Sequence, residues 1–136
     1  MKSQADVKKL MAEIFNACMI TREDGQKEYA HNEANALQNF DDEAKNLDIP
    51  RMKVWAVFAG KHWRGIRAYI NGHKSQREDV RGRIKDLIVY LVLLEAMIYD
   101  DESRSAATTA QQEEGHRRQN EGLQVSHISH NMGQQG

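Results

Sequence analysis

The sequence predicts an all-α protein, in which a four-helix, bundle-like domain is followed by a flexible polar tail. Apolar residues recur at steps of three and four through most of the first hundred positions, as they do in helices with one buried face. After about Glu102 the composition changes to Gln, Asn, Gly, Ser and His, which is typical of a segment without a core of its own. Because 136 residues hold at most one ordinary domain of roughly 100 to 200 residues, we expect one domain over 1–102 and a low-complexity tail over 103–136.

Bulk composition excludes few functions. Hydrophobic residues make up 40% of the chain, charged residues 29%, and the formal net charge is −1, which argues against disorder throughout and against a strongly basic nucleic-acid-binding surface. The single cysteine cannot form an internal disulfide, and no secretory signal opens the chain, so we expect a cytoplasmic protein. The longest uncharged apolar run, Leu87–Leu94, is far shorter than the roughly 20 residues that span a bilayer, so no membrane partner is expected.

The first helix is expected over about residues 4–21. Its apolar stripe consists of Val7, Leu10, Met11, Ile14, Phe15, Cys18 and Met19. Ser3 followed by Asp6 approximates a capping box, and the stretch around Gly25 is expected to end the helix. The position of Cys18 on the stripe predicts a buried, inert side chain.

Two further helices are expected in the middle of the chain. The weaker one, about Asn32–Asn46, has its apolar positions at Leu37, Phe40, Ala44 and Leu47. The other begins at Pro50, which suits a first helical turn because that position has no hydrogen bond to lose, with Asp48 near the cap. Its wide apolar face includes Trp55, Phe58, Ile66 and Tyr69, and it is expected to end at the pair Asn71 and Gly72.

The fourth helix has the strongest pattern. Ser75 and Glu78 form a capping box ahead of it, and helical period continues to Asp100 through Val80, Ile84, Leu87, Ile88, Leu91, Leu94 and Ile98. A second stripe beside the apolar one holds Asp79, Arg83, Asp86 and Tyr90. This stripe is either a surface ion-pair ladder, worth a few tenths of a kcal/mol per pair, or a setting in which the Asp86 carboxylate coordinates magnesium.

Charge is segregated along the sequence. Eight acids lie between Glu23 and Asp48, whereas the segment Ile49–Arg77 has no acid and seven bases. One interpretation is that oppositely charged helices attract each other and solvate the surface. The other is that acids such as Glu33 and Asp42 coordinate a divalent metal while Lys61, Arg64 and Arg67 hold phosphate oxygens, which requires the two faces to meet across a cleft.

Several single residues have competing interpretations. His62 lies four residues from both Phe58 and Ile66, so it is either a hydrogen-bonded core histidine or a catalytic base or ligand. Glu95 falls on the apolar side of the fourth helix, which suggests pairing with a base of the third helix. The spacing of the tail histidines, His116, His127 and His130, fits no compact metal site, so we regard them as incidental.

Three segments resemble a known family. They are Tyr29 with Ala36–Phe40, then Lys61–Ile66, then Glu78 with Gly82–Leu91. Together they look like the small phage and prophage proteins of the nucleotide-modification-associated domain type, which are similar in layout to the all-α nucleoside triphosphate pyrophosphohydrolases of the MazG and dUTPase-like group. The resemblance covers about residues 10–100 and implies a nucleotide-binding protein in a bacterial host cell, with magnesium as cofactor.

The resemblance also implies a set of site residues. Carried over by motif position, the candidate pocket residues are Asn39, Lys61, His62, Arg83, Asp86 and Tyr90, with the aromatic Tyr29 beside them. Val89 stands where the family pattern favours Asn, and the four-acid signature that holds the metal in MazG-type sites is absent. Without converging acids a metal would be held weakly and hydrolysis would lose its main source of rate, although binding can survive.

Three functions are therefore considered. The first is a magnesium-dependent hydrolase or other processing enzyme acting on a nucleoside triphosphate. The second is a non-catalytic binder, for example a phage anti-defence protein that sequesters a nucleotide second messenger. The third is a DNA-associated structural or interaction protein that uses Ile49–Arg77 as a phosphate-contacting face. For the first two functions, the broad apolar face of the third helix and the family resemblance imply a homo-oligomer.

Overall fold

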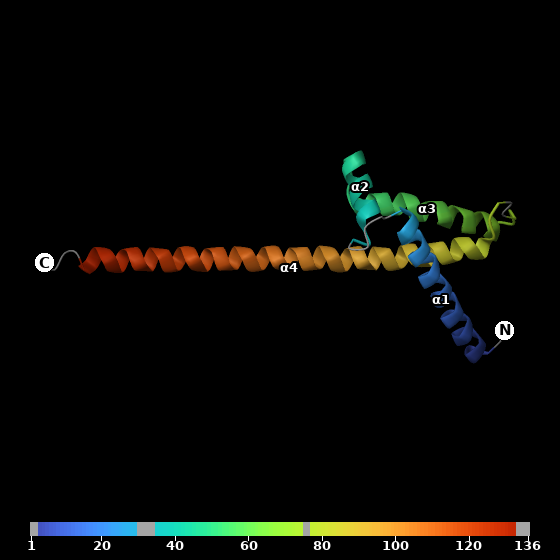
Figure 1. Cartoon of the computed structure of the whole chain (residues 1–136), viewed down its shortest axis with the longest axis horizontal. Coiled ribbons are helices and arrows are strands. Elements are labelled where there is room, and N and C mark those ends of the chain that lie inside the picture. The colour runs from blue at the N-terminus through green and yellow to red at the C-terminus, as the bar shows by residue number, and fades with distance from the viewer. Residues whose placement is uncertain (1–2, 30–34, 75–76, 133–136) are drawn as a thin grey trace. The chain divides into compact units, whose positions relative to one another are not determined.

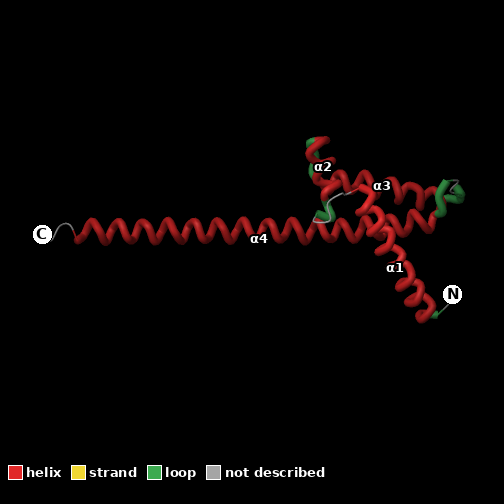
Figure 2. Tube along the Cα trace, viewed as in Figure 1, coloured by secondary structure: helices red, strands yellow, loops and turns green. Residues whose placement is uncertain are grey.

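The computed structural model describes residues 3–29, 35–74 and 77–132. In these ranges the regular elements are helices, without strands (Figure 2). In chain order they are α1 (Gln4–Tyr29), α2 (Gln38–Leu47), α3 (Arg51–Ile70) and α4 (Val80–Met132) (Figure 1). The predicted all-α fold class is therefore confirmed. The chain divides into two compact units, unit 1 over Met1–Met97 and unit 2 over Ile98–Gly136.

Helix α1 begins at the predicted capping box. The backbone nitrogen of Ser3 donates to Asp6 Oδ2 at 3.2 Å, and the backbone nitrogen of Asp6 donates to Ser3 Oγ at 3.1 Å. The predicted end near Gly25 is wrong, because α1 continues to Tyr29. A helical glycine costs only about 1 kcal/mol relative to alanine, and good helix formers such as Glu23 and Glu28 surround this one.

A tight turn connects α2 to α3. Asp48 has a left-handed backbone with φ of 52°, and the next backbone nitrogen, that of Ile49, donates to Ala44 O at 3.1 Å. This hydrogen bond satisfies a carbonyl at the end of α2, as in a Schellman motif. Asp48 therefore ends α2 instead of capping α3, contrary to the prediction, and Pro50 is the N-cap residue of α3.

The predicted boundaries between α3 and α4 are mostly confirmed. Helix α3 ends at Ile70, and Gly72 follows with φ of 89°, a conformation that glycine adopts at little cost. The predicted cap residue Ser75 lies outside the described residues. Asp79 caps α4 instead, because its Oδ1 accepts from the backbone nitrogen of Arg81 at 3.0 Å.

The core of unit 1 lies where α2, α3 and α4 meet. Its buried cluster consists of Leu37, Phe40, Val54 and Met97. The Phe40 ring packs against Phe58 and Tyr90 at centroid distances of 6.1 and 6.3 Å, and Trp55 Nε1 donates to Tyr90 O at 2.5 Å. These contacts fix α3 against the first half of α4.

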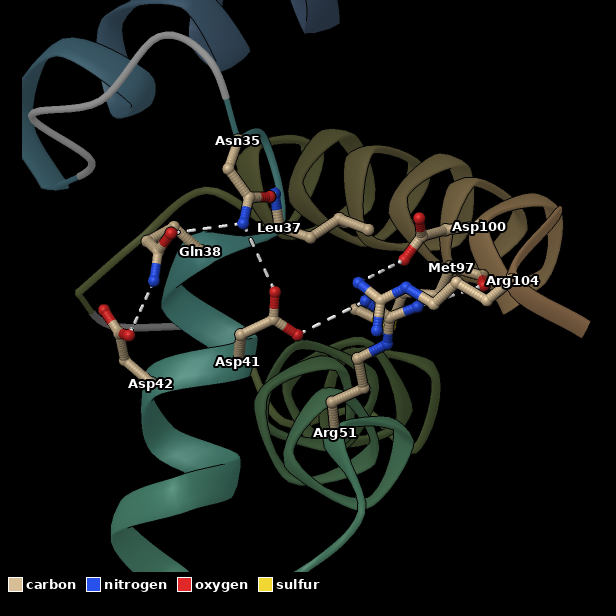
Figure 3. Close-up of polar contacts among 9 residues, drawn as sticks. All are labelled: Asn35, Leu37, Gln38, Asp41, Asp42, Arg51, Met97, Asp100 and Arg104. Atoms are coloured by element: carbon tan, nitrogen blue, oxygen red, sulfur yellow. Dashed lines mark hydrogen bonds and ion pairs between the residues drawn. The ribbon is translucent and has the colours of Figure 1, made fainter. Parts of the chain in front are cut away.

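A polar network closes one edge of this core (Figure 3). Arg51 Nη1 lies 3.3 Å from Asp41 Oδ1, and Arg51 Nη2 donates to Met97 O at 3.3 Å. Asn35 Oδ1 accepts from the backbone nitrogen of Leu37 at 2.9 Å, which forms an Asx turn ahead of α2. One arginine thereby holds the start of α3 to both α2 and α4.

Unit 2 is a helix stabilised locally. The prediction that the fourth helix ends near Asp100 is wrong, since α4 continues to Met132. Within unit 2, Arg104 pairs with Asp100 at 3.0 Å, and Arg117 and Arg118 both pair with Glu114 at 3.0 Å. Nearly all described side chains of this unit are exposed, so the predicted lack of a core holds for them.

Over the described residues, every helix is too short or too polar to pass through a bilayer.

Candidate functional site at the α3–α4 seam

Most of the predicted site residues belong to α3 and α4. Helix α3 carries Lys61, His62, Arg64 and Arg67, and α4 carries Arg83, Asp86 and Tyr90. Of the others, Asn39 is exposed on α2, and Asp42, also exposed there, accepts from Gln38 Nε2 at 2.6 Å. Glu33 and the side chain of Tyr29 lie outside what the structure describes. We define the α3–α4 seam as Lys61, His62, Gly65, Arg83, Asp86 and Tyr90.

His62 forms the centre of the seam. Its side chain is only 12% exposed, and its Nδ1 lies 3.3 Å from Asp86 Oδ2. The Tyr90 ring packs over the imidazole at a centroid distance of 5.3 Å and an interplanar angle of 33°. His62 Nδ1 is buried and the carboxylate is not aligned with it for a hydrogen bond, so this nitrogen has no hydrogen-bond partner within the described residues. His62 is therefore a core-facing histidine next to a charge, with an unsatisfied ring nitrogen.

Arg83 lies across α3 at Gly65. A Cβ atom built on Gly65 would lie 2.5 Å from Arg83 Cδ and 2.7 Å from Arg83 Nε, closer than such atoms can approach. Arg83 Nη2 pairs with Glu78 Oε2 at 3.5 Å, whereas the buried Nε has no hydrogen-bond partner within the described residues. Glycine at position 65 is therefore what lets the guanidinium pack on α3. The sequence interpretation missed Gly65, although a glycine inside a strongly helical segment was a usable signal.

The basic residues of α3 differ in their relation to the seam. Lys61 is exposed and precedes Gly65 by four residues, so helical geometry places it one turn from the position where Arg83 packs. Arg64 and Arg67 are also exposed and lie on neighbouring positions of the helix surface. The seam thus has a positive border on α3 and one carboxylate, Asp86, on its α4 side.

Tyr90 and Arg22 connect the seam to α1. Burial raises the pKa of Tyr90, the Asp86 charge raises it further, and Arg22 lowers it. Burial likewise lowers the pKa of Arg22, against a smaller opposite effect of Tyr90, and Arg22 Nη2 donates to Ala36 O at 2.8 Å. The sequence interpretation missed Arg22, because it assigned that residue to the end of the first helix.

Cys18 lies beside this group on α1. Its thiol is buried, as predicted, and donates to Lys85 O at 3.6 Å. Burial raises the pKa of the thiol, the Lys85 charge lowers it and the Asp86 charge raises it. A neutral, buried thiol is a poor nucleophile, in agreement with the inert role that the sequence predicted.

Two hollows lie between α1 and α4. The larger, of about 490 Å³, is lined mainly by apolar side chains with Arg22 and Glu23 among them, and the smaller, of about 350 Å³, includes Glu13, Arg81 and Lys85. Neither is lined by Lys61, Arg83 or Asp86. The seam and the hollows are therefore separate features of unit 1.

The acids predicted as metal ligands do not form a cluster within the described residues. No three His, Cys, Asp or Glu side chains of that part of the chain gather closely enough to hold a metal ion. Asp42 and Asp86 lie on different helices, α2 and α4. Glu95 is exposed on α4, so the burial suggested by its place in the apolar pattern is not found. His116 is exposed, its Nδ1 lying 3.0 Å from Gln112 O, and the side chains of His127 and His130 lie outside the described residues.

Comparison with known proteins returns no match to any family model, curated protein or solved structure. The resemblance to nucleotide-modification-associated proteins therefore stays a prediction, and the geometry of the seam has to support any functional proposal.

Proposed function

We propose that this protein binds a phosphorylated small molecule, a nucleotide or a nucleotide-derived signal, at the α3–α4 seam. The observation that carries the proposal is the pair of buried nitrogens, His62 Nδ1 and Arg83 Nε, that have no hydrogen-bond partner in the described structure. A buried donor left unsatisfied costs about 1–3 kcal/mol, so a purely structural seam would be expected to pair them. An anionic ligand that entered the seam would supply an acceptor for Arg83 Nε.

The residues around these nitrogens suit phosphate chemistry. The Arg83 guanidinium offers a planar set of donors that matches phosphate oxygens, and charge-assisted hydrogen bonds of this kind are roughly twice as strong as neutral ones. Lys61, one turn from Gly65, adds a point charge that can reach the outer phosphates.

The small number of carboxylates in the seam favours binding of the ligand without hydrolysis. Hydrolysis of a triphosphate draws on a metal ion held by several carboxylates, and the seam contains one, Asp86, which already lies against His62. The described residues do not fit a resident magnesium ion, and we assign no catalytic step to one. Magnesium would instead arrive complexed to the phosphates of the ligand.

The proposal is tested by a matched pair of arginine variants. The full-length protein and the variants R83M and R81M would be titrated calorimetrically with a panel of nucleoside triphosphates, deoxynucleoside triphosphates and cyclic nucleotides. Arg81 belongs to the same helix, but its side chain is 81% exposed, and its Nη1 pairs with Asp79 Oδ2 at 3.4 Å, away from the seam. We expect R83M to weaken binding at least tenfold and R81M to change it less than twofold. No binding across the panel, together with no small molecule in a native mass spectrum of the purified protein, would contradict the proposal.

Three outcomes separate the alternatives. Magnesium-dependent release of pyrophosphate from a bound nucleotide would identify an enzyme, whereas recovery of the intact ligand after incubation with magnesium would support a sequestering protein of the phage anti-defence type. Salt-sensitive retention of duplex DNA that is lost when Lys61 and Arg64 are replaced would favour a DNA-associated protein instead.

A further inference from the structure

Unit 1 has an apolar face that its own helices leave uncovered. It comprises Val7, Met11, Phe15 and Met19 on α1 and Ile84 and Val92 on α4, all between 39% and 60% exposed. On α1 these residues recur every fourth position, so they form one stripe along the helix. Phe15, Met19 and Val92 line the larger hollow, and Ile84 lines the smaller.

We propose that a second copy of this chain covers this apolar face and forms a symmetric dimer through α1 and α4. A two-fold interface uses the same patch on both copies, so the patch must present both projections and recesses. This face has both, because Val7 and Met11 are exposed outside the hollows, whereas Phe15 and Met19 line the larger hollow. The larger hollow, of about 490 Å³, has room for two or three large apolar side chains, since a cavity of about 150 Å³ accommodates a benzene molecule.

Both hollows are lined by acidic as well as basic residues. This mixture favours a second copy of the chain over a partner whose surface carries charges of a single sign. The larger hollow has Arg22 with Glu23, and the smaller has Glu13 with Arg81 and Lys85. A patch that carries both signs can oppose itself about a two-fold axis with acid against base, whereas a patch of one sign would repel its copy. The balance of charges therefore permits self-association.

The exposed area is also of the size that a dimer needs. The six side chains are each 39–60% exposed, so together they leave several hundred Å² of apolar surface in water. A standard interface buries about 800 Å² per partner, of which a little over half, about 450 Å², is apolar. A contiguous apolar patch of this size is as large as the largest that monomers usually expose, and such patches often mark interaction sites. The inference does not depend on the ligand of the seam, which is a separate feature.

The first test is the mass of the full-length chain in solution. Sedimentation equilibrium would be run on the wild type, on F15E and M19E, and on V57E as a control. Val57 is an exposed apolar residue of α3 that does not line either hollow. We expect the wild type and V57E each to form a dimer, and F15E and M19E each to associate at least tenfold more weakly. A wild-type monomer at all concentrations, or equal weakening in V57E, would overturn the proposal.

A second measurement keeps the test decisive if a glutamate variant loses its helical circular dichroism. Oxidation of individual methionines in the wild-type protein would be followed by mass spectrometry at low and high protein concentration. Met11 and Met19 should oxidise at least threefold more slowly at high concentration, while the fully buried Met97 should stay unreactive at both. Concentration-independent oxidation of Met11 and Met19 would contradict a dimer on this face.

Discussion

The α2–α3 region of unit 1 and the helix of unit 2 are stabilised in different ways. Around Phe40 and Val54, helices are held by buried apolar side chains that come from three different elements. In unit 2, the helix is supported by pairs within one or two turns, such as Glu114 with Arg118. Helical structure in the first region therefore depends on tertiary packing, and in the second on local propensity.

The largest expected effect comes from the packed region. Truncating the buried ring in F40A removes its contacts with Phe58 and Tyr90, and we expect the free energy of unfolding to fall by about 3–5 kcal/mol. Urea denaturation followed by near-ultraviolet circular dichroism measures this. The control is L123A in unit 2, where the side chain is 64% exposed and the change should stay within about 0.5 kcal/mol. Equal losses in both variants would remove the distinction between the two regions.

A smaller loss is expected at the edge of the same core. Arg51 is largely buried and bonds both Asp41 and Met97 O, so R51M should lower the free energy of unfolding by about 1.5–3 kcal/mol. The variant R104M is the matched change in unit 2, where the partner Asp100 lies within the same helix and a few tenths of a kcal/mol are expected. Urea denaturation of both variants gives the comparison, which fails if R104M is the more damaging.

Alkaline pH should also affect unit 1 through Tyr90. The folded state raises the pKa of Tyr90 above its ordinary value of 10.0, mainly by burial. The contribution of Tyr90 to the free energy of unfolding is fully present below pH 10. It is lost as the pH rises from there through the pKa of Tyr90 in the folded state. The variant Y90F should lose less stability than the wild type between pH 9 and pH 11, as followed by urea midpoints. Parallel losses in the two proteins would show that Tyr90 is not the responsible group.

A modest gain is expected at Gly60. A Cβ atom there meets only Arg64 Nη1, at an ordinary 3.8 Å, so G60A should raise the free energy of unfolding by about 0.5–1 kcal/mol through helix propensity. Thermal unfolding monitored by circular dichroism is sufficient to detect this. A loss of stability would mean that α3 is not a regular, solvated helix at this position.

The smallest effect belongs to unit 2. E114Q removes the shared partner of Arg117 and Arg118, and we expect a loss of about 0.3–0.5 kcal/mol per pair in local helix stability. Hydrogen exchange of the backbone amides around residue 114 resolves a change of this size. High salt should abolish the difference from the wild type, because exposed pairs are screened. A difference that persists in high salt would point to something other than an ion pair.

The same contrast explains what could be predicted from the sequence. Periodicity identified α3 and the start of α4 because their apolar positions repeat for many turns. It missed the extension of α4 to Met132, since a helix held by propensity and short-range pairs carries no apolar stripe. The end of α1 and the role of Asp48 were predicted wrongly for a related reason, as Gly25 and Asp48 are ambiguous between turn and helix until their neighbours in space are known.

The candidate site shows the same limit. Motif positions identified His62, Arg83 and Asp86, which the structure brings together with Tyr90 on one seam. The glycine at position 65 was a usable signal, but the sequence could not show which side chain packs on it, because Arg83 lies eighteen positions later on another helix. Helices α2 and α3 do meet, through the Arg51–Asp41 pair, but Asp42, the acid predicted as a metal ligand on α2, bonds its helical neighbour Gln38.

The seam is tested most directly by a calorimetric titration of the wild type, G60A and G65A with the nucleotide that binds best. The two substitutions add the same methyl group to the same helix, but only at position 65 would the Cβ collide with Arg83, at 2.5 Å from its Cδ. If the seam is the binding site, G65A weakens binding at least tenfold and G60A leaves the dissociation constant unchanged within twofold. Equal affinity in all three proteins would contradict ligand binding at the α3–α4 seam.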